Sequence, residues 1–333
     1  MAPSIHRRRP WEIVSPGEET DPKHFLDRRR FLKGAVATAA GLGAIGATAS
    51  LLAGEGNVDR FAIPKGPQGI ESIGFPVKRN AAFTLDRPLT GEKVAATTNN
   101  FYEFTTDKKR VATLAQKLPV DPWSIEVAGL CEKTGTFDYA FFVEKMPFEE
   151  RLYRFRCVET WAMAVPWTGY PLARLIEKLK PKAEARWIRF ETFLKPEVAP
   201  GQRERGYYRW PYHEGLRLDE AMNELTLVVT GIYGHAMPRQ HGAPLRIVCP
   251  WKYGYKSPKS IVRIELTAEQ PKTFWNVLQP EEYGFYSNVD PGVPHPRWSQ
   301  ATEQMIGTGE RRDTLKYNGY GGMVDNLYTG KEH

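Results

Sequence analysis

One cysteine in this sequence, Cys157, has charged neighbours that could favour reaction or metal binding by its thiol. Cys157 is one of only three cysteines, and it follows an alternating apolar run that predicts a strand over residues 151–158. An arginine precedes it, and strand alternation places the carboxylate of Glu159 on the same face. A thiol that loses its proton in this setting acts either as a nucleophile or as the ligand of a soft metal ion.

The other cysteines offer no alternative framework. Cys131 and Cys249 form no Cys-x-x-Cys motif with Cys157, and an odd number of cysteines excludes complete pairing. A single Cys131–Cys249 disulfide stays open. His213 and His235 lack the paired ligand spacing of a Cys/His zinc site, as does His241. The cysteine pattern therefore indicates neither a disulfide scaffold nor zinc.

A second candidate cluster surrounds one short strand. The segment 242–246 (Gly-Ala-Pro-Leu-Arg) enters this strand, and the segment 251–259 that leaves it carries Lys252, Lys256 and Lys259. Backbone N–H groups and cationic side chains in such a loop suit a phosphate or another anion. The P-loop pattern is absent. A solvated basic loop explains these residues equally well, so the segment alone does not decide.

The elements that position these residues predict an α+β fold with mixed sheets and short helices. Apolar residues alternate over several strand-length segments, and no repeated β-α-β order is present. Residues 171–180 read as a helix, with proline in its first turn and one apolar face. We expect the irregular residues 283–333 to wrap the core. The other expected strands are 123–129, 186–192, 225–233, 244–250 and 260–267, and a short helix is expected at 137–145.

The first 49 residues read as an export signal rather than as part of the fold. Residues 28–33 (Arg-Arg-Arg-Phe-Leu-Lys) precede an apolar run rich in Gly and Ala, which resembles a twin-arginine signal with Asp27 in place of the usual hydroxyl residue. Small residues at 47–49 offer a cleavage site, and a membrane anchor is the alternative. The twin-arginine export machinery carries folded proteins, so we expect a periplasmic protein with a cofactor inserted beforehand, and one domain over residues 50–333.

Charge and length narrow the function further. The net charge of the 333 residues is +7, and no basic run alternates with aromatic residues on a recognisable scaffold. The charge pattern therefore does not indicate a nucleic-acid partner. The length is sufficient for a substantial single core.

Several motifs in order resemble one known family. The chain resembles the catalytic subunits of periplasmic protein-methionine-sulfoxide reductases, which are sulfite-oxidase-fold molybdoenzymes, over roughly residues 55–333. His241 departs from this pattern, which commonly has asparagine there. The motifs are Asn-Asn-Phe-Tyr-Glu-Phe at 99–104, Arg-Cys-Val-Glu-Thr-Trp at 156–161, Pro-Trp at 166–167, Phe-Glu-Thr at 190–192, Gly-Ala-Pro-Leu-Arg at 242–246 and the segment from Trp251 to Lys259.

The resemblance implies one molybdenum-molybdopterin per chain, without an added nucleotide. It makes Cys157 the thiolate ligand of the metal, and Glu159 a candidate proton relay. Arg246 and the segment 257–259 would hold the pterin phosphate. The cofactor-binding residues it implies are Asn99, Asn100, Tyr102, Glu103, Thr192, His241, Arg246, Ser257, Pro258 and Lys259.

The implied activity is removal of an oxygen atom from methionine sulfoxide, free or in oxidised periplasmic proteins. Electrons would come from a membrane haem b subunit that oxidises quinol. Aromatic residues of 274–286 and Trp298 would form the rim of an exposed site. Two alternatives remain: a sulfite oxidase-like enzyme, and a metal-free exported protein that holds an anion with Lys252, Lys256 and Lys259.

Overall fold

The computed structural model describes residues 62–329 and 332. These residues belong to one compact unit, Val58–His333. The expected export signal, its cleavage site and the alternative of an anchor fall on residues 1–61 and lie outside the described residues.

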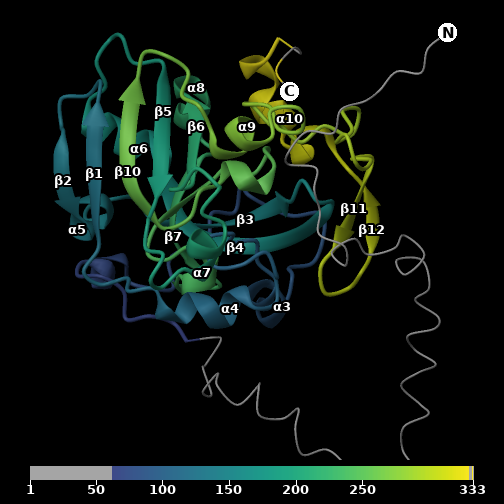
Figure 1. Cartoon of the computed structure of the whole chain (residues 1–333), viewed down its shortest axis with the longest axis horizontal. Helices are drawn as coiled ribbons and strands as arrows, with labels where there is room; N and C mark the ends of the chain where they lie inside the picture. Colours follow the sequence, from purple (N-terminus) through teal and green to yellow (C-terminus); the bar gives the residue numbers. More distant parts are fainter. Residues whose placement is uncertain (1–61, 330–331, 333) are drawn as a thin grey trace, which may run out of the picture. The chain divides into compact units, whose positions relative to one another are not determined.

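The first sheet has five strands in the order β2-β1-β10-β5-β6 (Figure 1). β1 and β10 run parallel, and the other neighbours run antiparallel. Buried and partly exposed residues alternate along β5, as a half-buried strand requires. The strands are β1 (Ser124–Gly129), β2 (Gly135–Asp138), β5 (Trp187–Thr192), β6 (His213–Arg217) and β10 (Ile261–Thr267).

The second sheet has seven strands and holds the most buried part of the chain. Its path is β12-β11-β4-β7-β8, with β3 beside β4 and β9 beside β7. β7 is buried at every position and β4 at all but its two ends, so neither shows alternation. The strands are β3 (Glu149–Arg156), β4 (Trp161–Pro171), β7 (Leu227–Ile232), β8 (His235–Ala236), β9 (Arg246–Val248), β11 (Thr302–Met305) and β12 (Arg311–Asp313).

Short helices connect and flank the sheets. The helix expected at 171–180 is confirmed as α6 (Leu172–Leu179), whose buried face consists of Leu172, Leu175, Ile176 and Leu179. The other α-helices are α3 (Glu92–Thr97), α4 (Val111–Leu114), α5 (Tyr139–Val143), α7 (Pro200–Glu204), α8 (Leu218–Met222), α9 (Phe274–Leu278) and α10 (Gly321–Val324). The 3₁₀ turns are η2 (Ile70–Ile73), η3 (Ala115–Lys117), η4 (Arg239–His241), η5 (Gly254–Lys256), η6 (Lys316–Gly319) and η7 (Asp325–Leu327). Mixed sheets with short helices confirm the predicted α+β class.

Three expectations about local structure need correction. β3 ends at Arg156, so Cys157 lies in the turn before β4, because the chain reverses there to pair β4 with β3. The helix expected at 137–145 begins only at Tyr139, since residues 135–138 pair with β1 as β2. The tail is less irregular than expected, because β11 pairs in parallel with β4.

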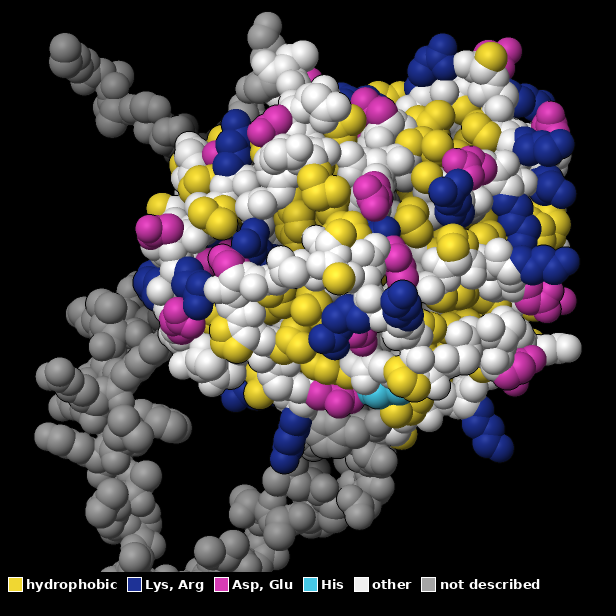
Figure 2. Space-filling view, turned by 180° about the vertical axis from the view of Figure 1, so that it is seen from behind, with side chains coloured by type: hydrophobic (Ala, Val, Ile, Leu, Met, Phe, Trp, Pro, Cys, Tyr) yellow, Lys and Arg dark blue, Asp and Glu magenta, His cyan; other side chains and the backbone are white. Residues whose placement is uncertain are grey.

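The surface mixes charges of both signs. On the face shown in Figure 2, lysine and arginine side chains gather along one edge, whereas acidic side chains are scattered over it. None of the helices in the described part of the chain is long and apolar enough to cross a membrane.

Candidate active site

A cavity of about 390 Å³ collects the predicted site residues. Its walls come from the loop after α3, the turn between β3 and β4, the segments around η4 and η5, and α9 with the loops beyond it. These elements are far apart in sequence. The predicted residues that line the cavity are Asn99, Asn100, Tyr102, Glu103, Cys157, Glu159, His241, Arg246, Ser257, Pro258 and Lys259; Thr192 does not line it.

The Cys157 thiol is buried in the wall of this cavity. Its Sγ lies 3.4 Å from Asn100 Nδ2, 3.4 Å from the Glu159 backbone N and 3.7 Å from Glu159 Oε2. Burial, with the negative charge of Glu159 beside it, raises the pKa of Cys157 to about 12. In the described part of the chain, no histidine ring forms a hydrogen bond with Sγ. The thiol therefore keeps its proton at neutral pH unless a cation displaces it, which favours the ligand role over the nucleophile role.

Glu159 is held from both sides. Its Oε2 accepts a hydrogen bond from Asn100 Nδ2 at 2.7 Å, and its Oε1 lies 3.1 Å from Lys108 Nζ. Burial by itself raises the pKa of Glu159, but the Asn100 hydrogen bond and the Lys108 charge outweigh it, so the net pKa is lowered. The carboxylate is ionised at neutral pH. It meets Cys157 across the turn, not by the strand alternation that the sequence suggested.

Arg246, which is buried, and Lys259, which is partly buried, bring two cationic side chains to the cavity without a carboxylate partner. Arg246 donates to the carbonyls of His241 and Ser257 at 2.8 and 3.0 Å. Lys259 Nζ donates to the carbonyls of Asn100 and Gln240 at 2.8 and 3.3 Å. Neither forms an ion pair with any described carboxylate. Uncompensated buried cations are costly, so this end of the cavity suits an anion.

The protonation states at this end follow from burial. Burial lowers the pKa of Arg246 to about 9 and that of Lys259 well below its usual range. Burial, together with the Lys259 and Arg246 charges, also lowers the pKa of His241 far below its ordinary value. His241 is therefore neutral, and its ring adds no charge to the anion site.

Gly242 allows Lys259 to lie close to the preceding segment. Its φ of +103° is a left-handed conformation that glycine adopts readily. A Cβ at this position would lie 2.7 Å from Lys259 Cβ. Any larger residue would displace the lysine from the cavity.

Glu103 and Thr192 form a pair at the back of the cavity wall. Thr192 Oγ1 donates to Glu103 Oε1 at 2.8 Å, so Thr192 lies behind a residue that lines the cavity. Burial raises the pKa of Glu103 to about 7, against the opposing hydrogen bonds of its backbone and Thr192. Asn99 lines the cavity too, although its Nδ2 donates to Ala96 O at 3.0 Å and so caps α3.

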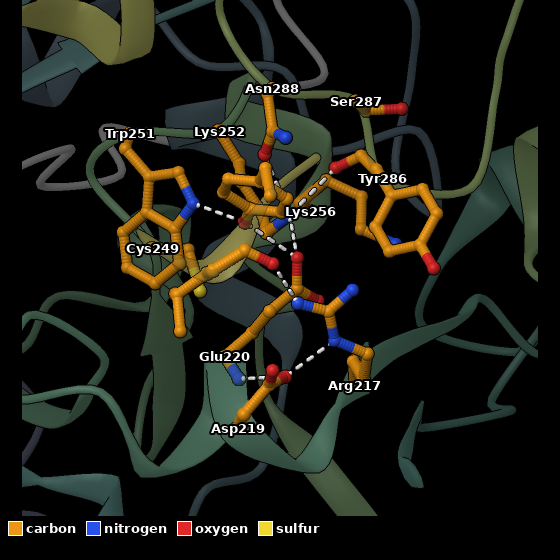
Figure 3. A network of polar contacts seen from close by, with 12 residues as sticks. Arg217, Asp219, Glu220, Cys249, Trp251, Lys252, Lys256, Tyr286, Ser287 and Asn288 are labelled. Atoms are coloured by element: carbon orange, nitrogen blue, oxygen red, sulfur yellow. Dashed lines mark hydrogen bonds and ion pairs between the residues drawn. The ribbon is translucent and has the colours of Figure 1, made fainter. Parts of the chain in front are cut away.

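Lys252 and Lys256 do not face an anion site. Lys252 Nζ lies 2.6 Å from Glu220 Oε1 and Lys256 Nζ lies 2.6 Å from Glu214 Oε2, with all four side chains buried. Lys252 Nζ also donates to Asn288 Oδ1 at 2.8 Å (Figure 3). The idea of three lysines holding an anion is therefore wrong for two of them, because each already neutralises a buried carboxylate.

Aromatic side chains surround the rest of the cavity. Trp275 meets Tyr102 and Tyr283 with ring centroids 5.2 Å apart in each pair. Trp298 stacks on His295 at 3.7 Å. Of the expected rim, Trp275, Tyr283 and Trp298 line the cavity, whereas Phe274 is buried. Lining residues that sequence reasoning missed or left to the core are Phe155, Trp161, Met163, Tyr208, Tyr212 and Arg297.

The donor set fits a metal brought in by an organic cofactor. The described residues contain no group of three or more His, Cys, Asp or Glu side chains placed to share a metal ion. All three cysteines are free and buried, so the bridge between Cys131 and Cys249 is not formed. One buried thiol and two cations without carboxylate partners line the same cavity, and such a set would suit a metal-bearing group that carries an anionic substituent.

One family model matches part of the chain, and one solved structure is similar to it. Residues 112–275 match the family described as the oxidoreductase molybdopterin binding domain. The segment runs from α4 into α9, so Cys157, Arg246 and Lys259 fall inside it while Asn100 and Trp298 fall outside. The crystal structure of the sulfane dehydrogenase SoxCD from Paracoccus pantotrophus is similar with a TM-score of 0.40 and 14% identity, covering 82% of this chain and 67% of that chain.

Proposed function

We propose that the protein is a molybdopterin-dependent oxidoreductase that reduces methionine sulfoxide, free or within oxidised proteins, because residues 112–275 match the oxidoreductase molybdopterin binding domain. The observation that carries the proposal is the shared cavity, where the Cys157 thiol, the ionised Glu159 and the unpaired cations Arg246 and Lys259 meet. Each of these features suits one part of a molybdenum-pterin reductase site.

The protein's own groups divide the work of holding the cofactor. Cys157 ligates the metal as a thiolate, while Arg246 and Lys259 bind the pterin phosphate through charge-assisted hydrogen bonds. Asn100 Oδ1 is buried and unpartnered in the described structure, so it is available to a ligand in the same cavity. The bound cofactor supplies two-electron redox chemistry with oxygen-atom transfer.

The aromatic walls suit the substrate. Sulfur makes favourable contacts with aromatic rings, and a methionine sulfoxide side chain is a neutral, unbranched group that can pack against the cavity wall to which Trp275, Tyr283 and Trp298 contribute. The overall reaction takes two electrons and two protons and yields the thioether and water. Glu159 Oε2, held ionised beside the thiol, is placed to accept and pass on one of these protons.

The runner-up, sulfite oxidation, has less support. Sulfite is an anion and would need a free cation where it binds. Lys108, next to the lining residue Glu159, is paired with that carboxylate, and the lining residue Arg297 lies 2.8 Å from Glu282, so both cations already have carboxylate partners. The alternative of a metal-free anion-binding protein also has less support, because two of its three candidate lysines, Lys252 and Lys256, are paired with buried carboxylates.

The cellular setting is part of the proposal. The signal-like residues 28–33 support export by the twin-arginine route to the periplasm. The sequence resemblance supports a membrane haem b subunit, oxidising quinol, as the electron donor. Oxidised periplasmic proteins would be the substrates.

Metal analysis combined with two assays tests the proposal. We expect one molybdenum per chain, reduction of methionine sulfoxide by reduced viologen, and no oxidation of sulfite. Cys157→Ser removes the activity, whereas Cys131→Ser, a matched change of another buried cysteine, retains it. Sulfite oxidation without sulfoxide reduction would favour the sulfite oxidase alternative. A protein that folds but does not bind molybdenum would rule out both the sulfoxide reductase and the sulfite oxidase.

A further inference from the structure

The turn that presents Cys157 is backbone-strained. Thr160 has a φ of +70°, a left-handed conformation that a β-branched residue rarely adopts. Two backbone hydrogen bonds close the turn: Thr160 N donates to Cys157 O at 3.1 Å, and Cys157 N to Trp161 O at 2.9 Å. Such a conformation persists only where surrounding contacts hold it.

The contacts that hold the turn come from residues 298–304, far along the chain. Trp298 Nε1 and Gln300 Nε2 both donate to Val158 O at 2.8 Å. Gln304 N donates to Thr160 O at 2.8 Å. Two carbonyls of the turn are thereby anchored to this segment, which lies beyond the matched domain of residues 112–275.

Gln300 is the residue that bridges both ends of this arrangement. Its Oε1 accepts a hydrogen bond from Arg156 Nη2 at 2.9 Å, while its Nε2 binds Val158. Arg156 is fully buried and also donates from Nη1 to Cys157 O. Gln300 is itself buried, so water cannot easily replace either bond.

We propose that Gln300 is a positioning residue for the metal ligand: its amide joins Arg156 to Val158 and so fixes the direction of the Cys157 thiol. This inference rests on the proposed ligation of molybdenum by Cys157, and not on which substrate is reduced. Trp298 adds a second bond to the same carbonyl while its ring lines the cavity. The side chains of Trp298 and Gln300 thus support the proposed metal ligand from outside the matched segment.

Substitution of Gln300 in the molybdenum-loaded enzyme tests the proposal. Gln300→Leu removes both side-chain bonds with little change in volume. The matched control is Gln304→Leu, because it leaves the backbone bond from Gln304 N to Thr160 O in place and removes only a side-chain bond to the exposed Gly309 O. The measurements are the Mo(V) EPR spectrum, the molybdenum content, kcat and KM.

We expect Gln300→Leu to give a shifted or heterogeneous Mo(V) spectrum. We also expect kcat to fall about 10- to 100-fold, the usual cost of losing a group that orients a metal ligand. KM stays within about twofold, because the substrate walls are unchanged. Gln304→Leu keeps the wild-type spectrum. A folded Gln300→Leu protein that loses molybdenum, while Gln304→Leu retains it, supports the same conclusion.

Two further variants cover the case in which Gln300→Leu fails to fold. Gln300→Glu keeps the acceptor for Arg156 but removes the donor to Val158, and Trp298→Phe removes the other donor while keeping a ring. Wild-type Mo(V) spectra and kcat in both would overturn the inference. Altered spectra in an enzyme that does not reduce methionine sulfoxide would instead contradict the proposed function and leave the positioning role established.

Discussion

Lys108 Nζ lies 3.1 Å from Glu159 Oε1, and this ion pair sits at the cavity with each side chain about one-third exposed. The lysine charge helps keep the pKa of Glu159 lowered despite its burial. Lys108→Met therefore raises that pKa. We expect the part of the pH–activity profile that is set by the ionisation of Glu159 to move to higher pH, by about one unit.

The neighbouring Lys109 supplies the control for this experiment. Lys109 is exposed and has no ion pair among the described residues, so Lys109→Met leaves the profile unchanged. If the two variants give the same profile, Glu159 does not contribute a limb and its relay role is wrong.

Glu103 gives a pH dependence of stability with a definite sign. Its pKa is raised by burial from 4.5 to about 7 in the folded metal-free protein. Between these values the unfolded chain loses the proton and the folded chain keeps it, so the free energy of unfolding falls as pH rises through this window. The expected loss from this group is on the order of 3 kcal/mol.

Denaturant unfolding of the metal-free protein at pH 4.5 and pH 8 measures this loss. Glu103→Gln flattens the dependence because the group no longer titrates, whereas Glu269→Gln, at an exposed position, does not. An unaltered slope in Glu103→Gln would show that another group controls the pH response.

The buried pair of Lys252 and Glu220 predicts a large loss of stability when only one partner is removed. Lys252→Met leaves the Glu220 carboxylate buried without its cation, which costs about 3–5 kcal/mol. Adding Glu220→Gln recovers part of that loss, and denaturant unfolding measures both. Loss of cofactor with full stability in Lys252→Met would return this lysine to a ligand-binding role.

Trp275 predicts a change in substrate binding rather than in chemistry. Trp275→Ala removes an aromatic wall, so we expect KM for methionine sulfoxide to rise about five- to tenfold with kcat nearly unchanged. Tyr207→Ala is the control, because Tyr207 is 74% exposed and does not line the cavity. Equal effects of the two changes would place the substrate elsewhere.

Much of the fold could be predicted from local patterns. Alternation predicts β1 and β5, and the apolar face predicts α6, because one period of burial is visible within six to eight residues. The long strand β4 has no such period. It is buried between β3 on one side and β7 and β11 on the other, so its continuous apolar run resembles any buried segment.

The site residues that belong to sequence motifs could be predicted. Those that reach the site only through the tertiary fold could not. The resemblance located Asn100, Arg246 and Lys259, all of which line the cavity. Lys108 and Gln300 carry no local signal. Gln300 meets Arg156 across 144 positions of sequence, and only the return of the tail to β4 brings them together.

Because Arg246 and Lys259 have no carboxylate partners, we expect resistance to proteolysis to depend on whether the cofactor is bound. A ligand that binds only the folded state adds RT ln(1 + [L]/Kd) to its stability, and an anionic cofactor would also neutralise two cationic side chains that have no carboxylate partner. Protein with bound cofactor therefore unfolds less often than protein without it. A brief protease pulse would digest the empty population first, so resistance to degradation reports loading before a single turnover.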